Sequence, residues 1–112
     1  MRYIIAALHE QGPARLIEAY AKHKGDRLER TTTYAQLEAL LEEGMPDILV
    51  MDANLGNPRS ADITPARDAY ARVRGHARFI AMTGSFYAEA ACRREGIPVI
   101  LKGQTSVFEF LE

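Results

Sequence analysis

Three polar residues, Asp52, Thr83 and Lys102, each stand directly after a short apolar run. If these runs are parallel strands of a buried sheet, their carboxyl ends meet at one edge, where open α/β sheets bind ligands. There a carboxylate can act as a nucleophile, while a hydroxyl and an ammonium stabilise the oxygens of a transferred phosphoryl group. Asp52 can therefore be a phosphoacceptor, a metal ligand or a cap, and Thr83 and Lys102 could serve the oxygens of a phosphoryl group held beside it.

Residues near the ends of two of these segments can also supply metal ligands. Phosphoryl transfer needs a cation beside the phosphoryl oxygens, and hard cations such as Mg²⁺ take oxygen ligands. Asp52 and Glu10 offer carboxylates, and Asn54 offers its main-chain carbonyl. His9 offers a nitrogen that suits Zn²⁺ or another softer metal better than Mg²⁺, although a loop histidine more often makes an ordinary hydrogen bond. Asp52, Glu10 and Asn54 are therefore candidate metal ligands, with His9 a less favoured one; Glu10 and His9 can equally be ordinary residues of the first turn.

The same residues also have simpler structural interpretations. Asp52 can cap a loop and pair with Lys102, and Thr83 can be the N-cap of the helix expected at 86–95. Lys102 can be a solvated lysine, although the apolar residues before it favour a specific counter-ion, because buried charges are usually paired. The position of all three residues at the ends of expected strands favours the chemical interpretation.

Strand-like and helix-like patterns alternate along the chain. The apolar runs lack the alternation of a half-exposed strand, as expected when helices cover both faces of a sheet. Leu16, Ile17 and Tyr20 form a helical stripe in the first expected helix, and Thr64-Pro65 predicts the N-cap and first residue of the third. The expected strands are 3–8, 27–31, 47–52, 78–83 and 98–102, and the expected helices are 13–24, 33–44, 64–74, 86–95 and 105–112.

Five strand–helix pairs without repeats or linkers predict an α/β fold with a doubly wound, five-stranded parallel sheet. Right-handed crossovers and the short chain favour the flavodoxin-like strand order 2-1-3-4-5. In that order, strands 1, 3, 4 and 5 adjoin one another, so their ends can build one site. The polar second strand suits a sheet edge. Residues 1–112 are expected to form a single domain.

Composition excludes several classes of protein. A net charge of -1 gives no electrostatic basis for binding nucleic acid or an anionic membrane. No apolar run is long enough to span a bilayer, and no signal peptide is evident. Cys92 is the single cysteine, which excludes an internal disulfide and fits a reducing compartment. The expected location is the cytoplasm.

Three segments, 44–56, 81–85 and 100–103, resemble in order the strand-end signatures of the receiver domain of two-component response regulators. They read GMPDILVMDANLG, AMTGS and ILKG. The resemblance implies a CheY-like (βα)5 domain in which Asp52 accepts phosphate from a histidine kinase or phosphotransfer protein with the help of Mg²⁺. Thr83 and Lys102 would then couple the phosphoryl group to a conformational change.

The resemblance also implies how such a domain would act. It would bind a downstream protein, or a second copy of itself, through the face of its fourth helix, fifth strand and fifth helix. Phe86, Tyr87, Val99 and Phe108 are the candidate contacts on that face. The protein would be a signalling domain and not an enzyme, apart from its own phosphorylation and dephosphorylation.

The chain departs from the receiver pattern at four places. Where the family carries two adjacent acids after the first strand, this chain reads Ala7-Leu8-His9-Glu10-Gln11, so the affinity for Mg²⁺ should be lower. Gly103 stands where a proline usually follows the lysine, and Val99 stands where the family has an aromatic switch residue. The last helix is also short, and the chain ends inside it, which slightly favours excision from a longer protein.

Two alternatives therefore stay open. The first is a pseudo-receiver that binds a protein partner constitutively, without metal or phosphate. The second is a small α/β domain that binds a phosphorylated ligand or another anion through Lys102 and nearby helix N-termini.

Overall fold

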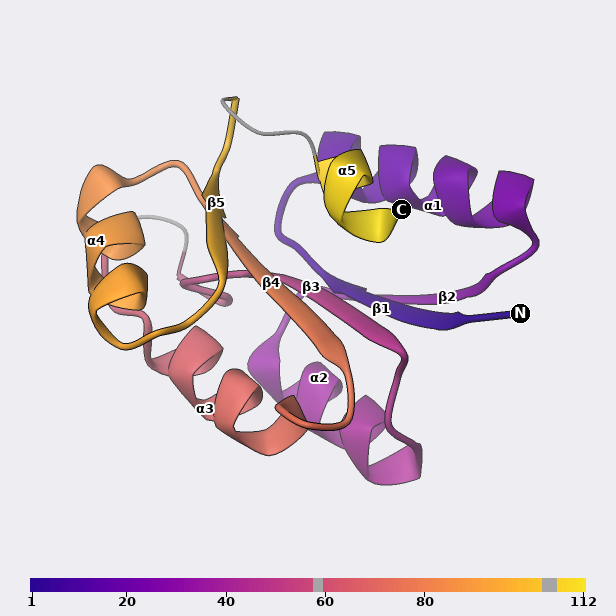
Figure 1. Ribbon diagram of the computed structural model, residues 1–112, viewed down its shortest axis with the longest axis horizontal. Helices are drawn as coiled ribbons and strands as arrows, with labels where there is room; N and C mark the ends of the chain where they lie inside the picture. The colour runs from indigo at the N-terminus through magenta and orange to yellow at the C-terminus, as the bar shows by residue number, and fades with distance from the viewer. Residues whose placement is uncertain (58–59, 104–106) are drawn as a thin grey trace.

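The computed structural model describes residues 1–57, 60–103 and 107–112. Within these ranges, five strands and five helices alternate along the chain (Figure 1). The strands are β1 (Tyr3–Ala7), β2 (Arg27–Thr31), β3 (Ile48–Asp52), β4 (Arg78–Thr83) and β5 (Val99–Leu101). The helices are α1 (Gln11–Lys24), α2 (Tyr34–Glu43), α3 (Thr64–Val73), α4 (Phe86–Arg94) and α5 (Val107–Leu111). The predicted start of the last helix, Thr105 and Ser106, lies outside the described residues.

The strands form one parallel sheet in the order β2-β1-β3-β4-β5, which confirms the predicted topology. Ala7 is in register with Met51, Asp52 with Met82, and Thr83 with Leu101. The carboxyl ends of β1, β3, β4 and β5 therefore lie level with one another. This register brings residues from distant parts of the chain to a single edge of the sheet.

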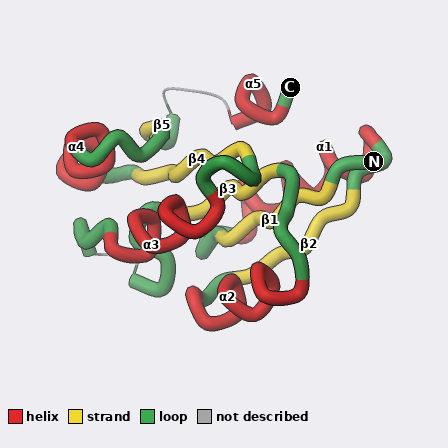
Figure 2. The backbone as a smooth tube through the Cα atoms, turned by 60° about the horizontal axis from the view of Figure 1, so that its bottom comes forward, coloured by secondary structure: helices red, strands yellow, loops and turns green. Residues whose placement is uncertain are grey.

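Helices cover both faces of the sheet (Figures 1 and 2). α2, α3 and α4 pack on one face, and α1 and α5 pack on the other. Alternate residues of β3 serve the two layers, since Leu49 and Met51 face α2, α3 and α4 while Ile48 and Val50 face α1 and α5. β3 is buried along its whole length, which explains why its sequence is apolar without alternation.

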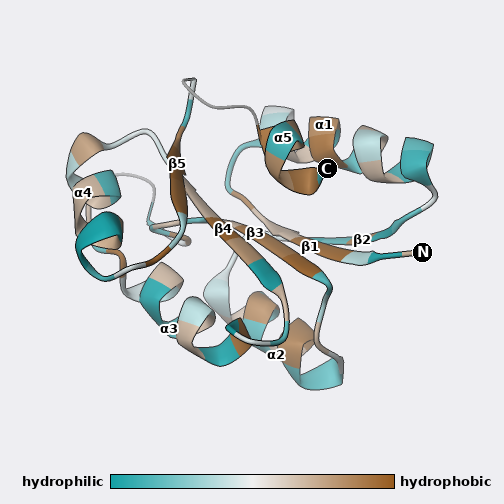
Figure 3. Ribbon diagram, viewed as in Figure 1, coloured by the Kyte–Doolittle hydropathy of each residue, from teal (hydrophilic) through white to brown (hydrophobic). Residues whose placement is uncertain are grey.

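Hydropathy follows the position of each strand in the sheet (Figure 3). The central strands β1, β3 and β4 are apolar, whereas β2 is polar and lies at one edge, as predicted. Cys92, on the buried side of α4, is fully buried, and this burial raises the pKa of its thiol to about 11. The thiol is therefore an inert core group. No helix in the described part of the chain is long and apolar enough to cross a membrane.

The buried face of α1 differs from the predicted stripe. Ile17 is buried as expected, but Leu16 is 59% exposed. Ala14 and Ala21 complete the buried face with Ile17, at the spacing of one side of a helix. The prediction that Leu16 belongs to the core is wrong, because the small alanines and not the larger leucine face the sheet.

Two helix starts also differ from the predicted N-caps. Thr64 is the first residue of α3 and not its N-cap; its main-chain N–H and its hydroxyl both donate to Asp62 Oδ1, at 3.0 and 2.6 Å. Ser85, and not Thr83, is the N-cap of α4, because its Oγ accepts the N–H of Ala88 at 3.2 Å. In both cases the cap lies one or two residues from the predicted position.

Candidate functional site

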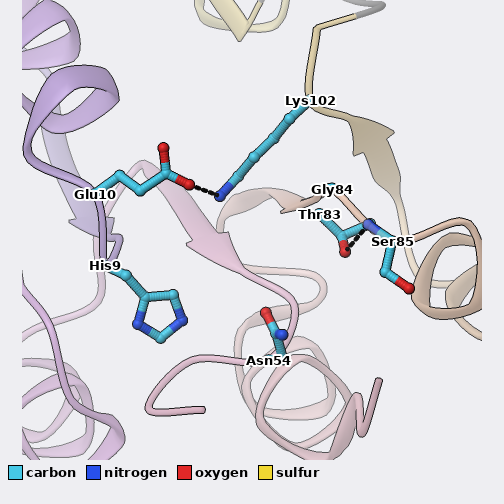
Figure 4. Close-up of a pocket in the computed structure, with 7 residues that line it drawn as sticks. All are labelled: His9, Glu10, Asn54, Thr83, Gly84, Ser85 and Lys102. Carbon is cyan, nitrogen blue, oxygen red and sulfur yellow. Dashed lines mark hydrogen bonds and ion pairs between the residues drawn. The ribbon is translucent and has the colours of Figure 1, made fainter. Parts of the chain in front are cut away.

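A pocket of about 330 Å³ opens at the carboxyl edge of the sheet (Figure 4). It is lined from the turn after β1, from the loop after β3, and from the ends of β4 and β5 and the residues just after them. Its lining residues are His9, Glu10, Asn54, Thr83, Gly84, Ser85 and Lys102. The structure thus brings together the residues that the sequence predicted for one site.

Asp52 is the last residue of β3 and lies behind the wall of this pocket. Its residue is 1% exposed, and it is not one of the pocket's lining residues. Its Oδ2 accepts the main-chain N–H of His9 at 2.7 Å, and its Oδ1 lies 2.9 Å from Lys102 Nζ. His9 and Lys102, which both line the pocket, therefore contact the carboxylate of Asp52 directly.

Lys102 is shared between two carboxylates. Its Nζ lies 3.2 Å from Glu10 Oε1 as well as 2.9 Å from Asp52 Oδ1, and Figure 4 shows the contact with Glu10. Burial alone would lower the pKa of Lys102, but Asp52 and then Glu10 outweigh that effect and raise the pKa. The ammonium is therefore held in its charged form beside Asp52. The side chain of Glu10, predicted as a metal ligand, points to Lys102 and is 63% exposed.

Thr83 connects the end of β4 to the start of α4. Its residue is 2% exposed, and its Oγ1 accepts the main-chain N–H of Ser85 at 3.0 Å. This bond uses the hydroxyl oxygen as an acceptor and leaves the hydroxyl hydrogen for another partner. Between the two residues lies Gly84, where an added Cβ would meet no atom within 4 Å. The pocket is therefore open beside Thr83.

Asn54 lines the pocket from the loop after β3. Its residue is 8% exposed, and its Nδ2 donates to the carbonyl of Ser60 at 2.6 Å. Its own main-chain carbonyl, the predicted metal ligand, accepts the N–H of Asn57 at 2.9 Å. A carbonyl oxygen has two lone pairs, so one stays available for a cation. The loop is thus held in place by bonds on both groups of Asn54.

The fit of this pocket to a cation rests on two buried lone-pair atoms. Asp52 Oδ1 and His9 Nε2 are buried and make no hydrogen bond of normal geometry with any described residue. Both atoms can ligate a metal, and the carbonyl of Asn54 is a third donor. Among the described residues, however, no group of three or more His, Cys, Asp or Glu side chains is placed to hold a metal ion. The oxygen donors that remain are the carboxylate of Asp52 and the carbonyl of Asn54, so a cation here would need further ligands from outside these side chains.

The residues predicted for an interaction face have different surroundings. Phe86 and Tyr87, in the first turn of α4, are 68% and 83% exposed. Val99 is buried in the core on the α2, α3 and α4 side of the sheet. Phe108 packs on the opposite side, with its ring centroid 5.5 Å from that of Tyr20. The prediction that Val99 belongs to the exposed face is wrong, because β5 turns that side chain inward.

Ser85 is the pocket residue that the sequence analysis did not assign to the site. It caps α4 and lines the pocket next to Thr83. A serine just before a helical run is a recognised N-cap signal, so this signal was present in the sequence. The bond from its N–H to Thr83 Oγ1 was not predictable, because it depends on the tight turn around Gly84.

No protein-family model matches the chain, and a search of curated proteins also finds no match. Solved structures do match it. A CheY-like receiver domain protein of Methanospirillum hungatei JF-1 has a TM-score of 0.74 and 16% identity, over 99% of this chain and 88% of that one. A response regulator of Burkholderia pseudomallei has a TM-score of 0.74 and 15% identity, over 99% of this chain and 65% of that one. SdrG of Pseudomonas melonis Fr1 has a TM-score of 0.67 and 26% identity, over 97% of this chain and 92% of that one.

The chain therefore has the fold of response-regulator receiver domains, with their five-stranded parallel sheet. This finding confirms the resemblance at the level of the fold. Fold likeness alone does not assign chemistry, which has to be argued from the pocket.

Proposed function

We propose that this protein is a signalling receiver domain in which Asp52 accepts a phosphoryl group. The observation that carries the proposal is the contact of 2.9 Å between Lys102 Nζ and Asp52 Oδ1 at a pocket that Thr83 also lines. Two structural neighbours support it: SdrG was solved in a BeF3-activated conformation, and the Burkholderia pseudomallei protein with a phosphorylated aspartic acid.

The transfer step follows from the geometry around Asp52. Oδ1, which lies beside the Lys102 ammonium, attacks the phosphorus of a phosphohistidine. The new O–P bond forms as the P–N bond breaks, and the released imidazole nitrogen keeps the electron pair of that bond and takes a proton. The N–H of His9 holds Oδ2 and so orients the carboxylate for this attack.

Lys102 and Thr83 respond to the new charge. The Lys102 ammonium, held charged by its neighbours, binds a phosphoryl oxygen, and the Thr83 hydroxyl donates to another. A divalent cation, for which the resemblance implies Mg²⁺, would be held by Asp52 and the carbonyl of Asn54 and would neutralise phosphoryl charge. Since Thr83 Oγ1 is bonded to the N–H of Ser85, a movement of Thr83 shifts the first turn of α4.

The proposed partners follow from this sequence of events. A histidine kinase or phosphotransfer protein in the cytoplasm donates the phosphoryl group. The exposed rings of Phe86 and Tyr87, in the turn that Thr83 moves, contact a downstream protein or a second copy of the chain. Beyond its own phosphorylation and dephosphorylation, the domain catalyses no reaction.

Incubation with acetyl phosphate and a divalent cation, followed by intact-mass measurement, tests the proposal. The unmodified chain should gain the mass of one phosphoryl group, and Asp52→Asn should not. Asp68→Asn, the same substitution at an exposed position of α3, is the matched control and should behave like the unmodified chain.

The burial of Asp52 favours a second candidate, the pseudo-receiver. A carboxylate that is 1% exposed and covered by His9 and Lys102 is poorly accessible to a phosphodonor. In that case the chain would bind its partner constitutively. No gain of phosphoryl mass at any cation concentration would exclude the phosphoacceptor and leave the pseudo-receiver.

A further inference from the structure

The contact between Glu10 and Lys102 joins two parts of the chain that are far apart in sequence. Glu10 lies in the turn after β1, and Lys102, 92 residues later, directly follows β5. Glu10 Oε1 lies 3.2 Å from Lys102 Nζ, and Figure 4 shows the two side chains pointing toward each other from separate elements that line the pocket. A carboxylate of the chain itself therefore already contacts the ammonium that the proposed function needs for a phosphoryl oxygen.

The two carboxylates that share Lys102 hold it in different ways. The side chain of Asp52 is 1% exposed and lies 2.9 Å from the ammonium, whereas the side chain of Glu10 is 63% exposed. Asp52 also contributes more than Glu10 to the raised pKa of Lys102. An ion pair open to solvent contributes little to stability, because water and salt compete for both charges. The contact with Glu10 is therefore the weaker one, and an incoming anion can replace it.

The position of Glu10 at the start of α1 leaves its side chain free to move. Glu10 is the N-cap residue of α1, where a side chain often accepts a main-chain N–H of the first turn. The side chain of Glu10 makes no such bond and reaches Lys102 instead. The main-chain carbonyl of Glu10 accepts the N–H of Ala14 at 3.4 Å whatever the direction of its carboxylate. The carboxylate can therefore leave Lys102 without unwinding the helix.

A phosphoryl group in the pocket would meet the same ammonium. It carries about two negative charges near neutral pH, against the single charge of Glu10. The hydroxyl of Thr83, whose oxygen accepts the N–H of Ser85, keeps its hydrogen for a phosphoryl oxygen in the same pocket. Two anions on one ammonium repel each other, so binding of the phosphoryl group and the contact with Glu10 oppose each other.

We propose that Glu10 is an internal competitor of the phosphoryl group: its carboxylate occupies Lys102 in the free chain and is displaced when a phosphate-like anion enters the pocket. Glu10 then sets how tightly the pocket holds such an anion. The inference deepens the proposed phosphoacceptor site and rests on that proposal for its use in signalling, but the competition is measurable with inorganic phosphate alone. The role is opposite in sign to that of a metal ligand, because losing a competitor strengthens the site.

Titration of the whole chain with inorganic phosphate, without a divalent cation and followed by the amide NMR shifts of Thr83 and Lys102, tests the competition. Glu10→Gln keeps the length of the side chain and removes its charge. It should bind phosphate about twofold to fivefold more tightly than the unmodified chain, the range expected when an exposed ion pair no longer has to be broken. Glu18→Gln changes another exposed carboxylate of α1, which lies 3.6 Å from Arg30 and does not line the pocket; this matched control should bind phosphate as the unmodified chain does.

A second substitution separates the contact from the charge. Glu10→Asp keeps a negative charge beside the pocket but shortens the side chain by one methylene group, which draws the carboxylate away from Lys102. It should therefore also bind phosphate more tightly than the unmodified chain. Unchanged affinity in Glu10→Gln, or Glu10→Asp with the affinity of the unmodified chain, would overturn the inference. So would titrations in which phosphate shifts neither Thr83 nor Lys102 in any of the proteins.

The two proposals fail in different ways. If Glu10→Gln tightens phosphate binding but the chain never gains a phosphoryl group from acetyl phosphate, the phosphoacceptor proposal fails and the competition stands. If the chain is phosphorylated at Asp52 while Glu10→Gln leaves phosphate affinity unchanged and slows phosphorylation, the phosphoacceptor stands and the inference fails. Glu10 would then support the cation and not compete with the phosphoryl group.

Discussion

At the amino edge of the sheet, both carboxylate oxygens of Asp26 accept hydrogen bonds from Arg2. At the carboxyl edge, Asp52 Oδ1 lies beside the ammonium of Lys102 but makes no hydrogen bond of normal geometry. We call the first the amino-edge pair, made of Arg2 and Asp26. The second is the carboxyl-edge triad, made of Glu10, Asp52 and Lys102. Both contain a nearly buried aspartate, with side chains that are 5% and 1% exposed.

The amino-edge pair is fully connected. Arg2 donates its main-chain N–H to Asp26 Oδ1 at 3.0 Å, and the Nε and Nη2 of its guanidinium donate to Oδ2 at 3.2 and 2.9 Å. A further guanidinium nitrogen donates to the carbonyl of Leu111 at 2.7 Å, which ties the end of α5 to the start of β1. Charge-assisted bonds of this kind are strong and directional, so this pair stabilises one arrangement of the chain ends.

The carboxyl-edge triad is incompletely connected. Two carboxylates share one ammonium, and the buried oxygen of Asp52 is left without a directed bond. Such an arrangement is less specific than the amino-edge pair, because one ammonium divided between two carboxylates forms fewer directed bonds to each of them. The comparison shows that the fold can satisfy a buried aspartate completely, and that it does not do so at the edge where the proposed chemistry lies.

The largest expected effect comes from removing the cation of the triad. Lys102→Met leaves Asp52 buried without a countercharge and should lower the free energy of unfolding by about 2 kcal/mol. Breaking a fully buried ion pair costs roughly 3–5 kcal/mol, and the loss here is smaller because Lys102 is partly exposed. Denaturant unfolding at neutral pH measures this loss. The double variant Asp52→Asn with Lys102→Met should recover most of it, and a loss that persists in the double variant would contradict the electrostatic explanation.

A smaller effect, which differs between the two edges, is expected when the same Asp→Asn substitution is made at each. Asp52→Asn removes a poorly satisfied charge and should leave the unfolding free energy unchanged or raise it by up to about 1 kcal/mol. Asp26→Asn breaks charge-assisted bonds and should lower the melting temperature. Thermal unfolding of both variants at neutral pH measures the contrast. A shift in the same direction for both would show that the two aspartates have equivalent roles.

Local patterns were sufficient to predict the sheet and the meeting of the site residues. The unalternating runs before Asp52, Thr83 and Lys102 indicate buried parallel strands, and parallel strands place their carboxyl ends at one edge. The structure confirms the strand order on which that argument depends. This part of the prediction succeeds because it needs only the order of the strands along the chain.

The details that local patterns did not reveal depend on contacts between distant elements. Leu16 has the hydropathy of a core residue, but α1 packs on the sheet through alanines. Val99 lies on an edge strand, where the sequence does not tell which side chains turn inward. The direction of Glu10 is decided by Lys102, which is 92 residues away in the chain. Side-chain partners of this kind require the assembled fold, whereas strand ends do not.

The pH dependence of the amino-edge pair gives the finest test of the comparison. The hydrogen bonds from Arg2 lower the pKa of Asp26 below its usual value. Because the pKa of Asp26 is lower in the folded chain than in the unfolded chain, its ionised carboxylate stabilises the fold at any pH above the unfolded value of about 3.9. This contribution is lost as the pH falls through the lower pKa of the folded chain. The unmodified chain should therefore be more stable than Asp26→Asn at neutral pH, and the difference should shrink below about pH 4.

Denaturant midpoints of both proteins, measured between about pH 7 and pH 3, follow this difference directly. Because Arg2 causes the pKa shift, the same comparison is made in the Arg2→Gln variant. There, the difference in stability caused by Asp26→Asn should change much less with pH. A difference that stays constant across the range in the presence of Arg2 would mean that Asp26 acts through its shape and neutral hydrogen bonds. The charge of Asp26 would then add nothing to the stability of the amino-edge pair. In that case the two sites would not differ in how completely their charges are paired.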